Sequence, residues 1–240
     1  MHRKIQVSDN VSGSVWKKFL LGDANAFSEI YNTYSDVMFS YGVCFTDDLE
    51  LVKDIIHDIF IKMYNNRALI ETSNLKFYLL RAMKNEIYCM LRSKKETCRI
   101  EEDMPSFSPE YSVEDIYIEN EHELSLKKDV MLLLNSLTSR QKEVIYYRYM
   151  EGLSINEIAD MMDMNYQSVS NLIQRSMERL RKIYTDSPTL LQSGRGDDDT
   201  NVERKDHEGN EMSYQFRFLD RWADFIIRYI SPLREIAQEI

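Results

Sequence analysis

Residues 153–184 read LSINEIADMMDMNYQSVSNLIQRSMERLRKIY, and this stretch decides the fold of the C-terminal half of the chain. Ser154 and Glu157 have the spacing of a capping box, which predicts a helix that starts just after Ser154. Asn165 can cap a second helix that runs to about Tyr184. Because the turn between the two helices is short, the stretch predicts a helix-turn-helix.

The second helix of such a motif enters the major groove, with its first turns against base edges. The side chains that we expect to read bases are Gln167, Ser168, Asn171, Gln174 and Arg175. Arg179 is expected to lie against phosphates, together with Arg181 and Lys182. Two short helices with a tight turn are common, so the motif alone does not establish DNA binding.

The composition predicts that the rest of the 240-residue chain is helical too. Apolar residues make up 43% of it and charged residues 29%, which is typical of a globular protein, and seven glycines and four prolines are few. Leu, Ile, Met, Lys and Glu recur at helical spacing, without the alternating pattern of strands. We therefore predict an all-α fold with two small helical domains.

The N-terminal part predicts a helical bundle. An amphipathic helix pair is broken near Gly22, where Asp23 can cap the second helix, and a further helix starts at residues 46–48. The polar face of that further helix holds Asp54, His57, Asp58 and Lys62. Adjacent residues on a helix point about 100° apart, so His57 and Asp58 do not indicate a metal site. We expect a solvated or partner-facing surface.

The next helix, from residue 75, mixes cations with aromatic rings. The candidate nucleic-acid contacts on it are Lys76, Tyr78, Arg81, Lys84, Asn85, Tyr88, Arg92, Lys94 and Lys95. Cations hold phosphates while rings stack on unpaired bases, so this composition favours single-stranded or melted nucleic acid. A plain solvated face is the alternative interpretation.

The net charge of −10 argues against nucleic-acid binding, but its distribution does not. Residues 1–95 and 124–185 each carry a net charge of +2, whereas residues 96–123 carry −9 and residues 186–240 carry −5. These limits predict an N-terminal domain, an acidic flexible linker, a helix-turn-helix domain and an acidic C-terminal extension.

Other classes of protein are disfavoured by what the sequence lacks. Cys44, Cys89 and Cys98 have no metal-binding or disulfide spacing, so we expect reduced thiols. We find no catalytic triad, phosphate-binding loop or metal motif, and therefore predict no enzyme activity, cofactor or metal. Without an apolar stretch that could be a signal peptide or a membrane span, we expect a cytoplasmic protein.

Two blocks of the sequence resemble an extracytoplasmic-function (ECF) sigma factor of bacterial RNA polymerase, a group of the sigma-70 family. The N-terminal block contains FLLGDANAFSEIYNTY (19–34), LELVKDIIHDIFIKMYNN (49–66) and LKFYLLRAMKNEIYCMLRSKK (75–95). The C-terminal block begins at LNSLTSRQKEVIYYRYMEGLS (134–154) and continues through the helix-turn-helix. The blocks occur in the order and spacing that the family requires.

The resemblance implies a subunit that binds core RNA polymerase, through the β′ clamp helices and the β subunit, and promoter DNA. It implies that the first domain melts and captures the −10 element and that the second reads the −35 element. The face with Asp54, His57 and Asp58 would dock on the clamp helices, and the linker would thread toward the active-site and RNA-exit channels.

The chain departs from the family pattern at a few positions. Cys89 stands where an Asp is usual, and Tyr78 where a Trp is usual. Ser170 and Leu172 replace customary basic residues of the recognition helix, so we expect weak reading of the upstream element. Asp163 replaces the turn glycine, and Asp tolerates left-handed backbone, so we expect the turn to be kept.

Residues 186–240 lie outside the family pattern and end in an amphipathic helix by periodicity. Its apolar stripe contains Phe218, Trp222, Phe225 and Tyr229, which would pack on the chain's own domain or dock on a partner. That partner could be an anti-sigma factor, an activator or a DNA-targeting protein, and we expect no membrane insertion. Two other functions stay open: a stand-alone helix-turn-helix regulator, and an adaptor that tethers polymerase through this extension.

Overall fold

The computed structural model describes residues 13–98, 106–108 and 130–186, and within them every regular element is a helix. The chain divides into two compact units, Met1–Ser106 and Phe107–Ile240, which we describe separately. The predicted all-α fold is confirmed. The predicted limits of the domains stay predictions, and the stripe from Phe218 to Tyr229 lies outside the described residues.

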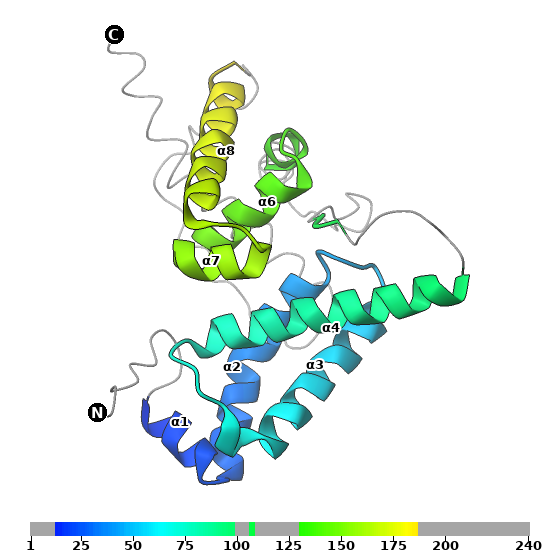
Figure 1. Ribbon diagram of the computed structural model, residues 1–240, viewed down its shortest axis with the longest axis vertical. Helices are drawn as coiled ribbons and strands as arrows, with labels where there is room; N and C mark the ends of the chain where they lie inside the picture. The colour runs from blue at the N-terminus through cyan, green and yellow to red at the C-terminus, as the bar shows by residue number, and fades with distance from the viewer. Residues whose placement is uncertain (1–12, 99–105, 109–129, 187–240) are drawn as a thin grey trace, which may run out of the picture. The chain divides into compact units, whose positions relative to one another are not determined.

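The first unit is a bundle whose longest helix lies across two others. Its elements are α1 (Gly13–Leu20), α2 (Ala24–Gly42), α3 (Leu49–Asn65), the short 3-10 turn η1 (Arg67–Leu69) and α4 (Leu75–Cys98). Figure 1 shows α4 crossing α2 and α3, and all three helices are in contact with one another. Ile30, Ile55 and Met83, one from each helix, are 1% exposed or less and form the centre of the core.

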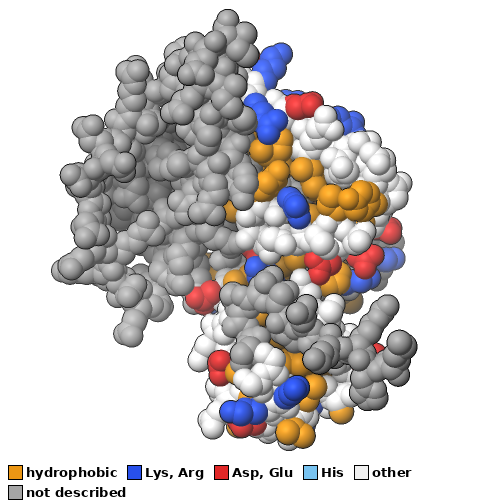
Figure 2. All heavy atoms as spheres, turned by 90° about the vertical axis from the view of Figure 1, so that its left-hand side faces the viewer, with side chains coloured by type: hydrophobic (Ala, Val, Ile, Leu, Met, Phe, Trp, Pro, Cys, Tyr) orange, Lys and Arg blue, Asp and Glu red, His pale blue; other side chains and the backbone are white. Residues whose placement is uncertain are grey.

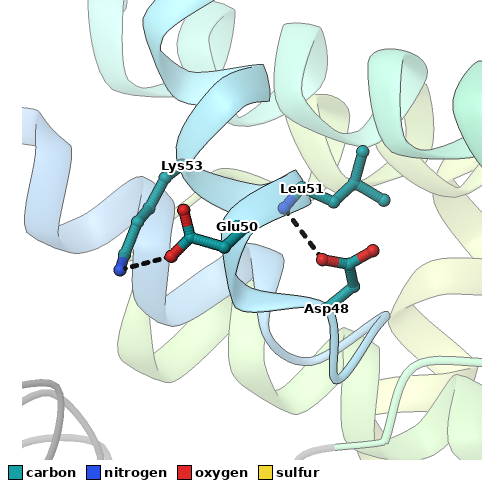
Figure 3. Close-up of polar contacts among 4 residues, drawn as sticks. All are labelled: Asp48, Glu50, Leu51 and Lys53. Atoms are coloured by element: carbon teal, nitrogen blue, oxygen red, sulfur yellow. Dashed lines mark hydrogen bonds and ion pairs between the residues drawn. The ribbon is translucent and has the colours of Figure 1, made fainter.

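The helices of the first unit begin where the sequence predicts. Asp23 accepts hydrogen bonds from the backbone N–H groups of Asn25 (2.8 Å) and Ala26 (3.2 Å) and so caps α2. Asp48 accepts one from the N–H of Leu51 at 3.0 Å at the start of α3, as Figure 3 shows. These bonds satisfy donors that have no partner within the helix.

Helix α2 packs tightly against its neighbours at Gly42, its last residue. A Cβ atom built there would lie 2.5 Å from Cε of Met83 and 2.8 Å from Cγ1 of Val52. Both distances are well below ordinary carbon–carbon contact. The absence of a side chain at Gly42 therefore lets α2 pack directly against α3 and α4.

The second unit contains the predicted helix-turn-helix. Its elements are a helical segment at 130–135, α6 (Ser139–Ile145), the π-helical turn η3 (Tyr146–Met150), α7 (Ile155–Met162) and α8 (Tyr166–Asp186). The capping box of Ser154 and Glu157 is formed, with Ser154 N–H donating to Glu157 Oε2 at 2.8 Å. A second capping box, Thr138 with Gln141, opens α6.

The π-helical turn η3 joins α6 to the loop before α7. The N–H of Glu151 donates to the carbonyl of Tyr146 at 3.1 Å, five residues back, and Arg148 Nη1 donates to the carbonyl of Leu153 at 3.0 Å. Tyr146 and Tyr147 are fully buried, and the Tyr147 hydroxyl donates to Glu143 Oε1 at 2.9 Å. The sequence pattern did not predict this turn, which places both tyrosines in the core.

The turn between α7 and α8 has the left-handed residue that the sequence suggested. Asp163 has φ 51° and ψ 52°, and the N–H of Met164 donates to the carbonyl of Ala159 at 3.0 Å. Asn165 Oδ1 then accepts from the N–H of Ser168 at 2.8 Å and caps α8. The expectation that Asp163 keeps the turn is confirmed.

Asp163→Gly should raise the free energy of unfolding of the second unit by about 0.5–1 kcal/mol, because Gly adopts left-handed backbone without the Cβ penalty. The matched control is Gly152→Ala, at a second left-handed position among the described residues of this unit, φ 69°, where a Cβ meets nothing within 4 Å. It should lower the free energy by about 1 kcal/mol. Urea unfolding measures both, and equal shifts of one sign would contradict the argument.

Two features fall within residues 96–123, the predicted linker, whose limits stay a prediction. Helix α4 continues to Cys98. Phe107 is 2% exposed and packs in the second unit, with its ring centroid 5.4 Å from that of Tyr146. One aromatic residue of an acidic stretch is thus part of the folded core.

Among the described residues, none of the helices is long and apolar enough to cross a membrane.

Candidate nucleic-acid interface

Helix α8 presents its predicted base-reading residues on one exposed side. Val169, Ser176, Met177 and Leu180 point into the second unit and are buried. At about 100° per residue, Gln167, Asn171 and Gln174 fall on the opposite side, and all three are exposed. Arg175 and Arg179 are exposed along the edge of this side, and Ser168 is half-buried. Tyr166, which the sequence analysis did not select, is 54% exposed at the first residue of α8.

The side chains of this exposed side are organised by hydrogen bonds along the helix. Gln167 Nε2 donates to Asn171 Oδ1 at 3.0 Å, which leaves an acceptor oxygen on Gln167 and a donor amide on Asn171. Arg175 Nε donates to the carbonyl of Asn171 at 3.2 Å. A donor beside an acceptor is the pattern that the major-groove edge of adenine pairs with.

The α4 stripe, which we define as Phe77, Arg81, Lys84 and Tyr88, is the second candidate surface. These positions are four, three and four residues apart and so lie on one side of the helix. The guanidinium of Arg81 lies 5.9 Å from the ring centroid of Phe77, and Lys84 Nζ lies 5.6 Å from that of Tyr88. The stripe therefore consists of two pairs of a cation and a ring.

Only some of the other α4 residues predicted to bind nucleic acid lie on the same side of the helix as the α4 stripe. Tyr78, Asn85 and Arg92 flank the stripe on the same side of α4, with Asn85 and Arg92 exposed. Lys76 lies instead on the side of the buried Leu79, Leu80 and Met83, and is half-buried. For Lys94 and Lys95 the structure describes only the helical backbone. Lys76 therefore faces another direction from the residues with which it was predicted to act.

The predicted polymerase-binding face of α3 is exposed and adjoins a groove. Asp54, His57, Asp58 and Lys62 are all exposed, and Lys62 Nζ lies 3.1 Å from Glu86 Oε1 of α4. The groove between α2 and α3 has a volume of about 360 Å³. It is lined by Phe27, Ser28, Tyr31, Asn32, His57, Phe60 and Ile61.

The aromatic lining of this groove was not predicted. The rings of Tyr31 and Phe60 lie 4.7 Å apart, and Ile61 beside them is 44% exposed. Helical periodicity places Tyr31 and Phe60 on the apolar faces of their helices, but it cannot show that the two helices leave a groove over them. The signal that was available is Ile61, an apolar residue among the polar residues of this face.

The charged side chains on the face drawn in Figure 2 are spread rather than concentrated. Lys and Arg side chains stand among apolar and uncharged atoms, with Asp and Glu between them, over the part of that face that the structure describes.

Comparison with known proteins shows which proteins the chain is similar to. The family description "Sigma-70, region 4" matches residues 127–180. SigM of Bacillus subtilis, an ECF RNA polymerase sigma factor, is 20% identical over 156 residues, which are 65% of this chain and 93% of SigM. SigW of the same organism, also an ECF RNA polymerase sigma factor, is 25% identical over 174 residues, or 69% of this chain and 92% of SigW.

The chain is therefore similar to the ECF sigma factors over about two thirds of its length. The similarity supports a role in transcription initiation at the level of the family, and α7 with most of α8 lies within the residues that match region 4. Among solved structures, this chain is similar to RpoE of Bartonella quintana, solved in complex with the anti-sigma factor NepR. The TM-score is 0.47 and the identity 17%, over 68% of this chain and 98% of RpoE.

Proposed function

We propose that the protein binds core RNA polymerase and directs promoter recognition, DNA melting and transcription initiation, as a binding subunit in the cytoplasm without catalytic activity of its own. The observation that carries this proposal is that two units of the chain each hold a surface suited to DNA in a different state. The α4 stripe pairs cations with rings, and α8 presents hydrogen-bonding side chains on its exposed side.

The first unit is the one that we assign to melted DNA. Unpaired bases can stack on aromatic rings, and cations beside those rings can hold the phosphates between them. Phe77, Tyr78 and Tyr88 are each half-buried, so part of each ring is accessible. Tyr88 also lies 5.9 Å from Phe45, ring to ring, so it stabilises the unit as well. In duplex DNA each base face is covered by the neighbouring base pairs and cannot stack on these side chains. This favours the melted −10 strand as the ligand.

The second unit is the one that we assign to the −35 duplex. Gln167 and Asn171 offer an acceptor and a donor together, while Arg175 and Arg179 are exposed beside them for phosphates. Ser170 and Leu172 are half-buried and uncharged where the family commonly has basic residues. The upstream contact is therefore expected to be weak, and the polymerase and the −10 contact must supply much of the affinity.

The exposed face of α3 and the adjoining groove are our proposed polymerase contact. A groove of about 360 Å³ lined by Phe27, Tyr31 and Phe60 can accept apolar side chains of a partner helix. Asp54 and Asp58 lie on the same helix as His57 and Ile61, so acidic groups border the apolar groove. This combination suits a partner with apolar anchors and cations around them.

Asp54→Ala combined with Asp58→Ala should weaken binding to core polymerase about 3- to 10-fold, since exposed ion pairs contribute about 0.2–1 kcal/mol each. Titration of labelled protein with core polymerase measures the change. The control, Asp47→Ala with Glu71→Ala, removes the same charge from other exposed positions of the first unit. If both double variants lose affinity equally while circular dichroism is unchanged, net charge rather than this face is responsible.

Capture of core RNA polymerase by the full chain tests the proposed function directly. A sigma factor is expected to bind core polymerase without DNA and to protect promoter DNA only as part of the holoenzyme. A stand-alone helix-turn-helix regulator would bind duplex operator DNA without polymerase, and that outcome would overturn the proposal. An adaptor would bind polymerase but leave open-complex formation unchanged when the α4 stripe is altered.

Regulatory partners of the C-terminal extension belong to the proposal as well. The complex of RpoE with an anti-sigma factor supports an inhibitor of that class as one partner, and an activator or a DNA-targeting protein is the alternative. We assign this contact to Phe218, Trp222, Phe225 and Tyr229, which lie outside the described residues. Deleting residues 211–240 should then leave the binding of core polymerase intact and change the regulation of the protein.

A further inference from the structure

The first turns of α8 carry no charged side chain. Residues 166–174 read YQSVSNLIQ, and the first charged residue of the helix is Arg175. The N-terminal residues of a recognition helix are the ones that contact base edges. Arg and Lys make the commonest specific contact to guanine, at its O6 and N7 atoms. The part of α8 that we assign to base reading therefore lacks the side chains that select guanine.

The exposed amides at this end of α8 match adenine instead. Gln167 Nε2 donates to Asn171 Oδ1 at 3.0 Å, so the two side chains are held together. This bond leaves the carbonyl oxygen of Gln167 as an acceptor and an amide N–H of Asn171 as a donor. Adenine presents a donor (its N6 amino group) beside an acceptor (N7) in the major groove, whereas guanine presents two acceptors. The pair is therefore complementary to adenine.

Tyr166 adds an apolar surface at the first residue of α8. The residue is 54% exposed, and it is one of the few large hydrophobic side chains that stay exposed in the part of the chain that the structure describes. In the major groove, apolar side chains contact the C5-methyl group of thymine. Packing the ring on that methyl group removes apolar surface from water, which is favourable. An exposed ring at this position therefore favours thymine.

These side chains are close enough along α8 to reach neighbouring base pairs. Tyr166 and Asn171 are five residues apart, which is about 7.5 Å along the helix at about 1.5 Å per residue. Successive base pairs are about 3.4 Å apart along the DNA axis. The segment from Tyr166 to Asn171 therefore covers about two base pairs, which suits one adenine and one thymine side by side.

The arginines of α8 come after this segment. Arg175 Nε donates to the carbonyl of Asn171 at 3.2 Å, which holds the side chain along its own helix, and Arg179 is exposed about one turn further on. We assign both arginines to phosphates, and phosphate contacts carry no sequence information directly. They therefore add affinity without adding a preference for guanine.

We propose that α8 reads an upstream element of A·T base pairs, in which Gln167 and Asn171 bond the major-groove edge of an adenine and Tyr166 packs on the methyl group of a neighbouring thymine. This inference rests on the proposed function, because it names the DNA that the second unit reads. A guanine in place of the adenine sets an acceptor against the acceptor oxygen of Gln167. That change should lower promoter occupancy about tenfold.

The first test identifies the upstream element with the holoenzyme. Core RNA polymerase and the full chain transcribe a library of duplex templates with randomised upstream DNA, and the 5′ ends of the transcripts locate the upstream element of each active template. We expect active templates to be enriched in A·T pairs there, with an adenine beside a thymine. Enrichment of guanine, or no enrichment, would overturn the inference alone. The absence of transcripts from every template would overturn the proposed function and this inference with it.

Base analogues then assign each contact to a side chain. 7-Deazaadenine lacks the N7 acceptor and deoxyuridine lacks the methyl group of thymine, while both keep Watson–Crick pairing. Each analogue should lower transcription by the parent holoenzyme about 3- to 10-fold. In Asn171→Ala the first analogue, and in Tyr166→Ala the second, should cause no further loss, because the contact is already absent. If the parent is insensitive to both analogues, DNA shape explains the preference and the proposed contacts are wrong. Equal losses in parent and variant would likewise refute the assignment to that side chain.

Asn171→Arg tests the exclusion of guanine by adding a cation to the uncharged segment. The enriched templates should then carry guanine in place of the adenine, because Arg pairs with its O6 and N7 atoms. The matched control is Asn156→Ala, which removes an exposed amide from α7 and should leave the enriched sequence as in the parent. An unchanged preference in Asn171→Arg, or the same change in the control, would contradict the inference.

Discussion

Arg81→Ala combined with Lys84→Ala is expected to reduce open-complex formation about 10- to 100-fold. Each cation lies over a ring of the α4 stripe, so its loss removes a phosphate contact and a cation–π pair that keeps the ring in place. Closed-complex binding should fall much less, because it depends on duplex contacts elsewhere. Permanganate footprinting of melted thymines, compared with gel-shift binding at low temperature, separates the two stages.

The control for this variant is Lys53→Ala, which removes a cation from the same unit but from α3, where Lys53 pairs with Glu50 at 3.0 Å as Figure 3 shows. Lys53→Ala should leave the melting of promoter DNA unchanged. Equal reductions at the closed and open stages would mean that the α4 cations provide only general attraction. The salt dependence of open-complex affinity should also weaken by about 1.4 in slope, since single-stranded contacts contribute about 0.7 each.

Gly42→Ala is expected to lower the free energy of unfolding of the first unit by about 1–3 kcal/mol. The new methyl group would meet Val52 Cγ1, on a stiff β-branched side chain, as well as the more adaptable end of Met83. Helices α2, α3 and α4 must separate slightly to admit it, and that separation weakens the core of all three. Thermal or urea unfolding followed by circular dichroism measures the change.

Gly13→Ala is the matched control for Gly42→Ala. Gly13 is the first residue of α1, and a Cβ there meets nothing within 4 Å. This variant should be neutral or more stable by up to about 0.5–1 kcal/mol, because alanine loses less backbone entropy on folding. A loss of stability as large as that of Gly42→Ala would show that glycine flexibility, not close packing, explains the effect.

Helix starts and turns were predicted well because their signals are local. Asp23, Ser154 and Asn165 each satisfy donors within a few residues of themselves, so the printed sequence already contains both partners. The side of α8 that faces away from the core followed from its periodicity in the same way. For α4, periodicity would also have separated Lys76 from Arg81, but composition alone grouped them.

The groove and the burial of Phe107 against Tyr146 were not predictable because each joins distant parts of the chain. Tyr31 and Phe60 come from different helices, and whether two buried-type residues form a groove depends on how those helices cross. Phe107 was hidden by the average composition of an acidic stretch, although burial depends on one side chain and on the space that receives it. Such contacts require the tertiary structure.

The π-helical turn η3 (Tyr146–Met150) determines how far the residues after it are rotated about the axis of α6. A π-helical turn takes up more residues than an α-helical turn, so the positions after it are rotated relative to a continuous helix. Deleting one residue there would restore an ordinary turn and rotate the following segment by about 100°. The residues directly after the turn, among them the buried Leu153, would then be turned by about a quarter of a turn relative to α6. The length of the turn therefore sets the direction in which the chain leaves α6 toward the helix-turn-helix.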